Sequence, residues 1–217
     1  MNWIIGNIPA AFFCLAVLPV ALHAQDSWKH EYTKGGISVY TRVTEGSSLK
    51  EFKGEGLVDA PLEVCRNVLM DVESQPKWQP DCTEVVVLKT EENAIIAYTT
   101  TDAPWPARNR DVITRTEVRY TENGMIFSFT GIDDPGLVPL RKDWVRITDI
   151  HGMWILVRKG DKTYATYQAK VNPGGAIPAW LANTTVTKQA FESLMGLRKM
   201  VLEPQYGLQP KQQAKSE

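Results

Sequence analysis

Histidine and cysteine are scarce in this chain of 217 residues, which has three of each. Beyond residue 24 only His30, His151, Cys65 and Cys82 remain, and they are widely separated in the sequence. Zinc sites are typically built from closely spaced pairs of such ligands. We therefore expect no metal site.

Motifs for nucleophilic catalysis and for cofactor binding are also missing. The chain has no Gly-x-Ser-x-Gly nucleophile elbow and no phosphate-binding loop ending in Lys-Ser or Lys-Thr. Gly54 and Gly56 begin a dinucleotide-like pattern, but Asp59 occupies the place of its third glycine. These absences predict a protein without a cofactor. They leave open an acid–base catalyst built from Asp, Glu and Tyr.

Neither sign of charge is in excess, because 24 Lys and Arg residues face 25 Asp and Glu residues. A near-neutral chain with scattered charges argues against nucleic acid as a partner and against strong attraction to anionic membranes.

The first 25 residues contain no Asp, Glu, Lys or Arg, and the stretch from Trp3 to Leu22 is almost wholly apolar. A small residue, Ala24, follows this stretch, so residues 1–24 are predicted to be a cleaved signal peptide. The protein is then secreted or periplasmic. The alternative is a retained anchor, since about 20 apolar residues span a bilayer. Pro9 and Pro19, near the ends of the run, favour cleavage.

Residues 25–205 are long enough for one well-cored domain, and residues 206–217 form a polar tail. An oxidising compartment permits a disulfide between Cys65 and Cys82. However, Cys65 shares a helical stripe with Leu62 and Leu69, the usual place of a small core residue. The disulfide stays an open question.

Apolar residues at helical spacing predict one helix before a series of strands and another after it. Asp59 and Pro61 predict the start of one helix. Short turns between the strands predict antiparallel neighbours, and residues 133–139 form a longer loop that could cover the sheet. The predicted strands are 83–90, 94–102, 111–120, 124–131, 141–149, 152–158 and 163–172.

The closing segment is apolar at helical spacing, and Pro204 ends it. Its apolar positions are Ala190, Phe191, Leu194, Leu197 and Val201. The predicted architecture is α+β: a helix-grip fold with a curved antiparallel sheet wrapped around a long C-terminal helix. The space between them is either a filled core or a ligand cavity.

Several short motifs occur between residues 28 and 204. They lie at residues 36–40, 49–56, 69–71, 77–82, 103–112, 144–146, 152–154 and 172–181. In the same order, they resemble those of the START domains, the lipid-transfer modules related to steroidogenic acute regulatory protein. Any one motif is weak, whereas the ordered set makes a chance match improbable.

The resemblance favours a real hydrophobic cavity over the close-packed interior that is otherwise expected. Parity along the predicted strands and spacing along the last helix select the ligand-binding candidates. They are Ala97, Thr99, Thr114, Thr116, Phe127, Phe129, Tyr167, Ala169, Leu181, Phe191 and Leu194. The pocket mouth is predicted at Trp105, Arg110, Asp111, Leu137 and Val138.

The sequence departs from the family at three cavity positions. Steroid-binding members place an acid and an arginine where this chain has Ala97 and Thr116, and phosphatidylcholine-binding members place an arginine where it has Gln75. These departures suggest a more neutral ligand. A surface ion pair between Arg110 and Asp111 is the alternative to a role at the pocket mouth.

Three hypotheses for function follow. The first is a monomeric carrier that sequesters or carries a lipid-like molecule, in transient contact with a membrane. The second is a helix-grip enzyme, such as a cyclase or hydratase, that acts on a hydrophobic substrate. The third is a structural partner in the cell envelope with a filled core.

Overall fold

The computed structural model describes residues 28–207 except 44–46, 104–106, 176 and 178. The predicted signal peptide and most of the predicted tail lie outside these residues. Within them, no helix is both long enough and apolar enough to cross a membrane.

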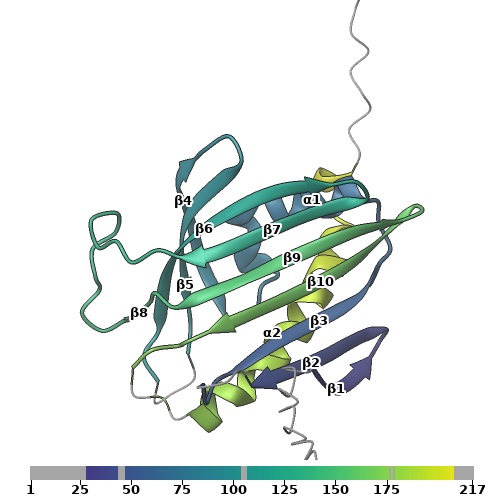
Figure 1. Cartoon of the computed structure of the whole chain (residues 1–217). Helices are drawn as coiled ribbons and strands as arrows, with labels where there is room; N and C mark the ends of the chain where they lie inside the picture. The colour runs from purple at the N-terminus through teal and green to yellow at the C-terminus, as the bar shows by residue number, and fades with distance from the viewer. Residues whose placement is uncertain (1–27, 44–46, 104–106, 176, 178, 208–217) are drawn as a thin grey trace, which may run out of the picture.

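A single ten-stranded sheet forms the body of the protein (Figure 1). Its main path runs in the order β1-β2-β3-β10-β9-β7-β6-β5-β4, with antiparallel neighbours throughout. The strands are β1 Lys29–Lys34, β2 Ile37–Val43, β3 Lys50–Val58, β4 Cys82–Thr90, β5 Ala94–Thr101, β6 Arg110–Thr121, β7 Gly124–Gly131, β8 Val145–Ile147, β9 Ile150–Lys159 and β10 Lys162–Val171.

The predicted strands agree with the observed ones to within about two residues, except for the segment 141–149. There only Val145–Ile147 is extended, and it pairs parallel with the first residues of β6. Arg141 stacks its guanidinium on the rings of Tyr98 and Trp144, so the chain before β8 packs through side chains instead of forming a ladder.

Both α-helices lie on one face of the curved sheet, which confirms the helix-grip fold (Figure 1). Helix α2, Ala179–Met200, packs against β2, β3 and β10, while α1, Leu62–Met70, covers parts of β9 and β10. Asp59 does not cap α1: Pro61 takes the N-cap position without a side-chain hydrogen bond, and Asp59 pairs with Lys162.

Gly54 of β3 lets α2 approach the sheet closely. A Cβ atom at this position would lie 2.8 Å from the backbone oxygen of Ala190 and 2.9 Å from the side chain of Leu194. Glycine is therefore the residue that fits where the central part of the helix meets the strand. The side chains around this contact belong to the main core, which buries Ala190, Leu194 and Leu197 completely.

A short 3-10 helix, η1 (Val72–Lys77), follows α1 and carries the chain toward β4. The end of the domain is also tied down here: Tyr206, which the sequence placed in the tail, is buried and donates a hydrogen bond to Asp71. Neither cysteine of the described chain forms a disulfide. Burial raises the pKa of both Cys65 and Cys82 to about 11.

Candidate functional site

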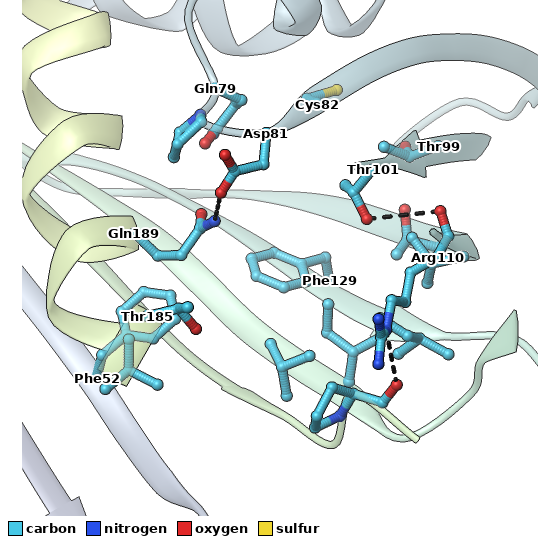
Figure 2. A pocket seen from close by; sticks show the side chains of 18 of the residues that line it. Phe52, Gln79, Asp81, Cys82, Thr99, Thr101, Arg110, Phe129, Thr185 and Gln189 are labelled. Atoms are coloured by element: carbon cyan, nitrogen blue, oxygen red, sulfur yellow. Dashed lines mark hydrogen bonds between the residues drawn. The ribbon is translucent and has the colours of Figure 1, made fainter. Parts of the chain in front are cut away.

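A cavity of about 340 Å³ lies between the inner face of the sheet, the first half of α2 and the segment that joins η1 to β4 (Figure 2). This volume is at the lower end of the range for small-molecule pockets, about 300–1,000 Å³. The space between helix and sheet is thus only partly filled by side chains.

Aromatic side chains form one part of the cavity wall. Trp154 of β9 and Tyr167 of β10 stack with their ring centroids 4.3 Å apart and their planes 9° apart. Phe52 of β3 meets Tyr167 edge to face at 5.2 Å, and Phe129 of β7 lies 6.3 Å from it. Burial raises the pKa of Tyr167, so its hydroxyl stays protonated at neutral pH. This part of the wall offers an apolar ligand a flat aromatic surface.

Arg110, the first residue of β6, brings a positive charge to the cavity. Only 6% of the residue is exposed, and burial lowers its pKa. Its guanidinium donates through Nε to the carbonyl of Pro173 at 3.4 Å (Figure 2). A terminal nitrogen of the same group donates to the carbonyl of Arg108. Within the described parts of the chain, no carboxylate forms an ion pair with it.

Asp81 connects the segment before β4 to helix α2 at the edge of the cavity. Its carboxylate accepts a hydrogen bond from Gln189 at 3.2 Å (Figure 2) and another from Lys188 at 3.1 Å. Its backbone is in the left-handed region, with φ 60°, and its carbonyl accepts from the backbone of Asp102. Asp81 therefore joins helix α2 to the end of β5 across the edge of the cavity.

The structure brings together part of the candidate set from the sequence. Six predicted ligand-binding residues and one predicted mouth residue line the cavity: Thr99, Thr114, Thr116, Phe127, Phe129, Tyr167 and Arg110.

Four other candidates lie apart from the cavity lining. Ala97 packs in a small cluster with Val72, Val85 and Ile95, where η1 packs against the neighbouring strand β4. Ala169 and Leu194 are in the main core, and Phe191 packs beside Tyr32. Trp105 and the side chain of Leu181 lie outside the described residues.

Asp111 lies on the opposite face of the sheet, so its assignment to the pocket mouth is wrong. Successive residues of a strand point to opposite faces, and Arg110 points into the cavity. On the outer face Asp111 accepts two hydrogen bonds from Arg146, at 2.8 and 3.1 Å, and one from Tyr98 at 2.9 Å. Burial alone would raise the pKa of Asp111, but these hydrogen bonds outweigh it and hold the pKa below its ordinary value. The predicted surface pair of Arg110 with Asp111 is also wrong.

The loop 132–144 contacts the same outer face of the sheet as Asp111. The carbonyl of Val138 accepts a hydrogen bond from Arg146, the partner of Asp111. Neither Leu137 nor Val138 lines the cavity, although the sequence placed them at its mouth. Most residues of the loop are exposed, so it leaves the cavity open and is tied to the sheet beside Asp111.

Comparison with known proteins identifies the fold and its relatives. The family model of the START domain matches residues 16–205. The chain belongs to the START domain family. An uncharacterised protein of Pseudomonas aeruginosa is 34% identical over 195 residues, which cover 89% of this chain and 96% of that protein.

Two further relatives of this START domain carry descriptive names. The crystal structure of a STAR-related lipid transfer protein from Xanthomonas axonopodis is 36% identical, has a TM-score of 0.76, and covers 82% of this chain and all of that fragment. The mouse START domain-containing protein 10 is 32% identical over 165 residues, 74% of this chain and 56% of that protein.

Of the three positions where the sequence departs from the steroid-binding and phosphatidylcholine-binding members, two line the cavity and one is in a buried cluster. Gln75 and Thr116 line the cavity, so the neutral side chains at these positions do face a ligand site. Ala97 is instead buried by Val72, Val85 and Ile95, so it does not face the ligand site.

Sequence reasoning expected the last helix to line the cavity of this START domain but missed the residues through which it does so. The cavity side of α2 is formed by Ala182, Thr185, Val186 and Gln189, which recur at helical spacing. Their small or polar character hid the signal, because the apolar stripe farther along the helix belongs to the core. Gln79 and Asp81 were missed because nothing in the sequence places the end of η1 over the sheet.

Proposed function

We propose that this START domain binds a lipid-like hydrophobic molecule in the cavity between α2 and the sheet, and carries or sequesters it. The observation that supports this most directly is the aromatic wall around Trp154 and Tyr167 next to unfilled space. Burying apolar ligand surface there yields about 25 cal/mol per Å². The similarity to a protein named for lipid transfer supports the same function.

The chemistry of the cavity favours a carrier over an enzyme. A general acid or base works best with a pKa near the operating pH. Burial moves the pKa of Tyr167 and of Cys82 further above neutrality, so neither exchanges protons readily there. Among the described residues, no group of His, Cys, Asp and Glu side chains could hold a metal ion.

Native mass spectrometry of the purified protein, followed by organic extraction, tests this function. We expect a co-purifying hydrophobic molecule that is recovered chemically unchanged after incubation. A converted molecule would favour the enzyme, and a protein that never takes up lipid from vesicles would refute the carrier.

We also propose that the carrier acts outside the cytoplasm, as a monomer that meets membranes transiently. The proposed location rests on the apolar segment 1–24, which ends in Ala24 before a polar chain. Mass analysis of protein from the native host should find these residues removed. An intact amino terminus in the membrane fraction would contradict the proposal.

A further inference from the structure

Arg110 differs from the other buried arginine at this end of the sheet. Arg146, on the outer face, also has a side chain that is only 6% exposed, but it forms a two-point ion pair with Asp111. Arg110, on the inner face, has only the carbonyl groups of Pro173 and Arg108 as hydrogen-bond partners among the interactions of the described chain. A buried charge without a counter-charge is unfavourable unless something else supplies one.

The acidic side chains near the cavity do not supply this counter-charge. Asp81 already faces Lys188. Asp102 is exposed and accepts a hydrogen bond from Asn109 at 2.9 Å. The charged neighbour that acts on Arg110 is Arg108, which has the same sign and, together with burial, lowers the pKa of Arg110.

Two threonine side chains line the cavity on the same side as Arg110. Thr101 is the residue opposite Arg110 across β5 and β6, and Thr99 lies one inward-facing position farther along. Both line the cavity, and Figure 2 shows them on the side of Arg110, with Phe129 between that side and the helix. The cavity is thus polar and positive at one end and aromatic at the other.

We propose that Arg110 binds the anionic headgroup, a carboxylate or a phosphate, of a single-chain amphiphile whose apolar chain lies against Phe129 and Trp154. A guanidinium matches either group with two parallel hydrogen bonds, and Thr99 can donate to a remaining oxygen atom, whereas the hydroxyl of Thr101 donates to the carbonyl of Arg110 at 3.5 Å. The volume of about 340 Å³ suits one acyl chain better than the two long chains of a membrane phospholipid. This assignment rests on the proposed carrier function and replaces the more neutral ligand that the sequence suggested.

Three ligands with one chain length test the anchor: hexadecanoate, hexadecyl phosphate and hexadecanol. Dissociation constants are measured by displacement of a fluorescent lipid from the protein, with each ligand kept below its solubility limit. We expect at least one of the two anions to bind the unmodified protein about tenfold or more tightly than the alcohol, as a charge-assisted hydrogen bond implies. Comparison of the two anions distinguishes a carboxylate site from a phosphate site.

Arg110→Met should remove the preference for the anion while keeping the affinity for hexadecanol. Arg115→Met is the matched control: Arg115 lies on the same strand, on the other face, paired with Glu91 and Glu117. This control should keep the preference.

The possible results separate the anchor from the carrier function. Equal affinity for alcohol and anions in the unmodified protein would overturn the anchor and leave the carrier intact, whether or not the Met variant folds. The same holds if Arg110→Met keeps the preference. If none of the three ligands binds, the carrier function fails and the anchor fails with it.

Discussion

Replacing Thr114 by tryptophan should fill the cavity without damaging the fold. Thr114 is in the middle of the cavity wall on β6, between Arg110 and Thr116 on the same face. The indole exceeds the threonine side chain by about the volume of four methylene groups, roughly a third of the 340 Å³ available. Each ligand methylene that no longer fits forfeits about 0.8 kcal/mol, so four of them forfeit about 3 kcal/mol, on the order of a hundredfold in affinity.

The neighbouring residue provides the control. Ile113 points to the opposite face of the same strand and is completely buried there. Ile113→Trp must overpack a filled region at a cost of about 1–3 kcal/mol or more, which lowers the melting temperature by roughly 2–12 °C in a domain of this size.

Calorimetric melting and binding of hexadecanoate measure both effects in the two variants. We expect Thr114→Trp to melt close to the unmodified protein and to bind weakly, and Ile113→Trp to melt early. If Thr114→Trp loses as much stability as Ile113→Trp, the region between helix and sheet is a filled core and the reasoning fails. If it keeps full affinity, the ligand lies elsewhere.

Two further predictions concern the groups on either side of the cavity. Asp111→Asn should cost about 3–5 kcal/mol in urea unfolding, because it leaves the buried charge of Arg146 unpaired. Since the folded pKa of Asp111 is lowered, its contribution is complete above the unfolded pKa of about 3.9 and is lost as the pH falls through the folded value. The variant should therefore lose less stability on acidification, and an unchanged acid profile would contradict this. Lys188→Met should speed ligand exchange with vesicles while changing stability by less than about 1 kcal/mol, because it removes an exposed ion pair with Asp81 that spans the cavity edge. The exposed Lys199→Met is its control, and equal exchange rates in both variants would show that the ligand leaves by another route.

The strands and helices of this fold were predictable because their periodicity is local. Alternation along β6 and β7 gave the faces of Thr114, Thr116, Phe127 and Phe129 correctly, since parity depends only on the strand itself. The assignment of Asp111 to the pocket mouth was wrong because it treated Asp111 as a companion of its sequence neighbour Arg110 and did not apply this parity.

What covers an inward-facing residue could not be predicted, because it depends on contacts distant in sequence. Ala169 shares its face with Tyr167, yet it is buried in the core. The opposite residue, Gly152, is so close to the ring of Phe129 that an added Cβ atom would lie 2.5 Å from it. The aromatic ring occupies the space that a small side chain on this face seemed to leave open.

The ion pair between Asp111 and Arg146 on the outer face of the sheet also determines the sign of the charge in the cavity. A slip of β6 by one residue against its neighbours would turn every side chain to the other face. Asp111 would then face the ligand and Arg110 would face Arg146, so an anion-attracting cavity would become an anion-repelling one. Arg146 and Tyr98 hold Asp111 at three points and oppose this slip. The selectivity of the cavity is thereby protected by residues that no ligand touches.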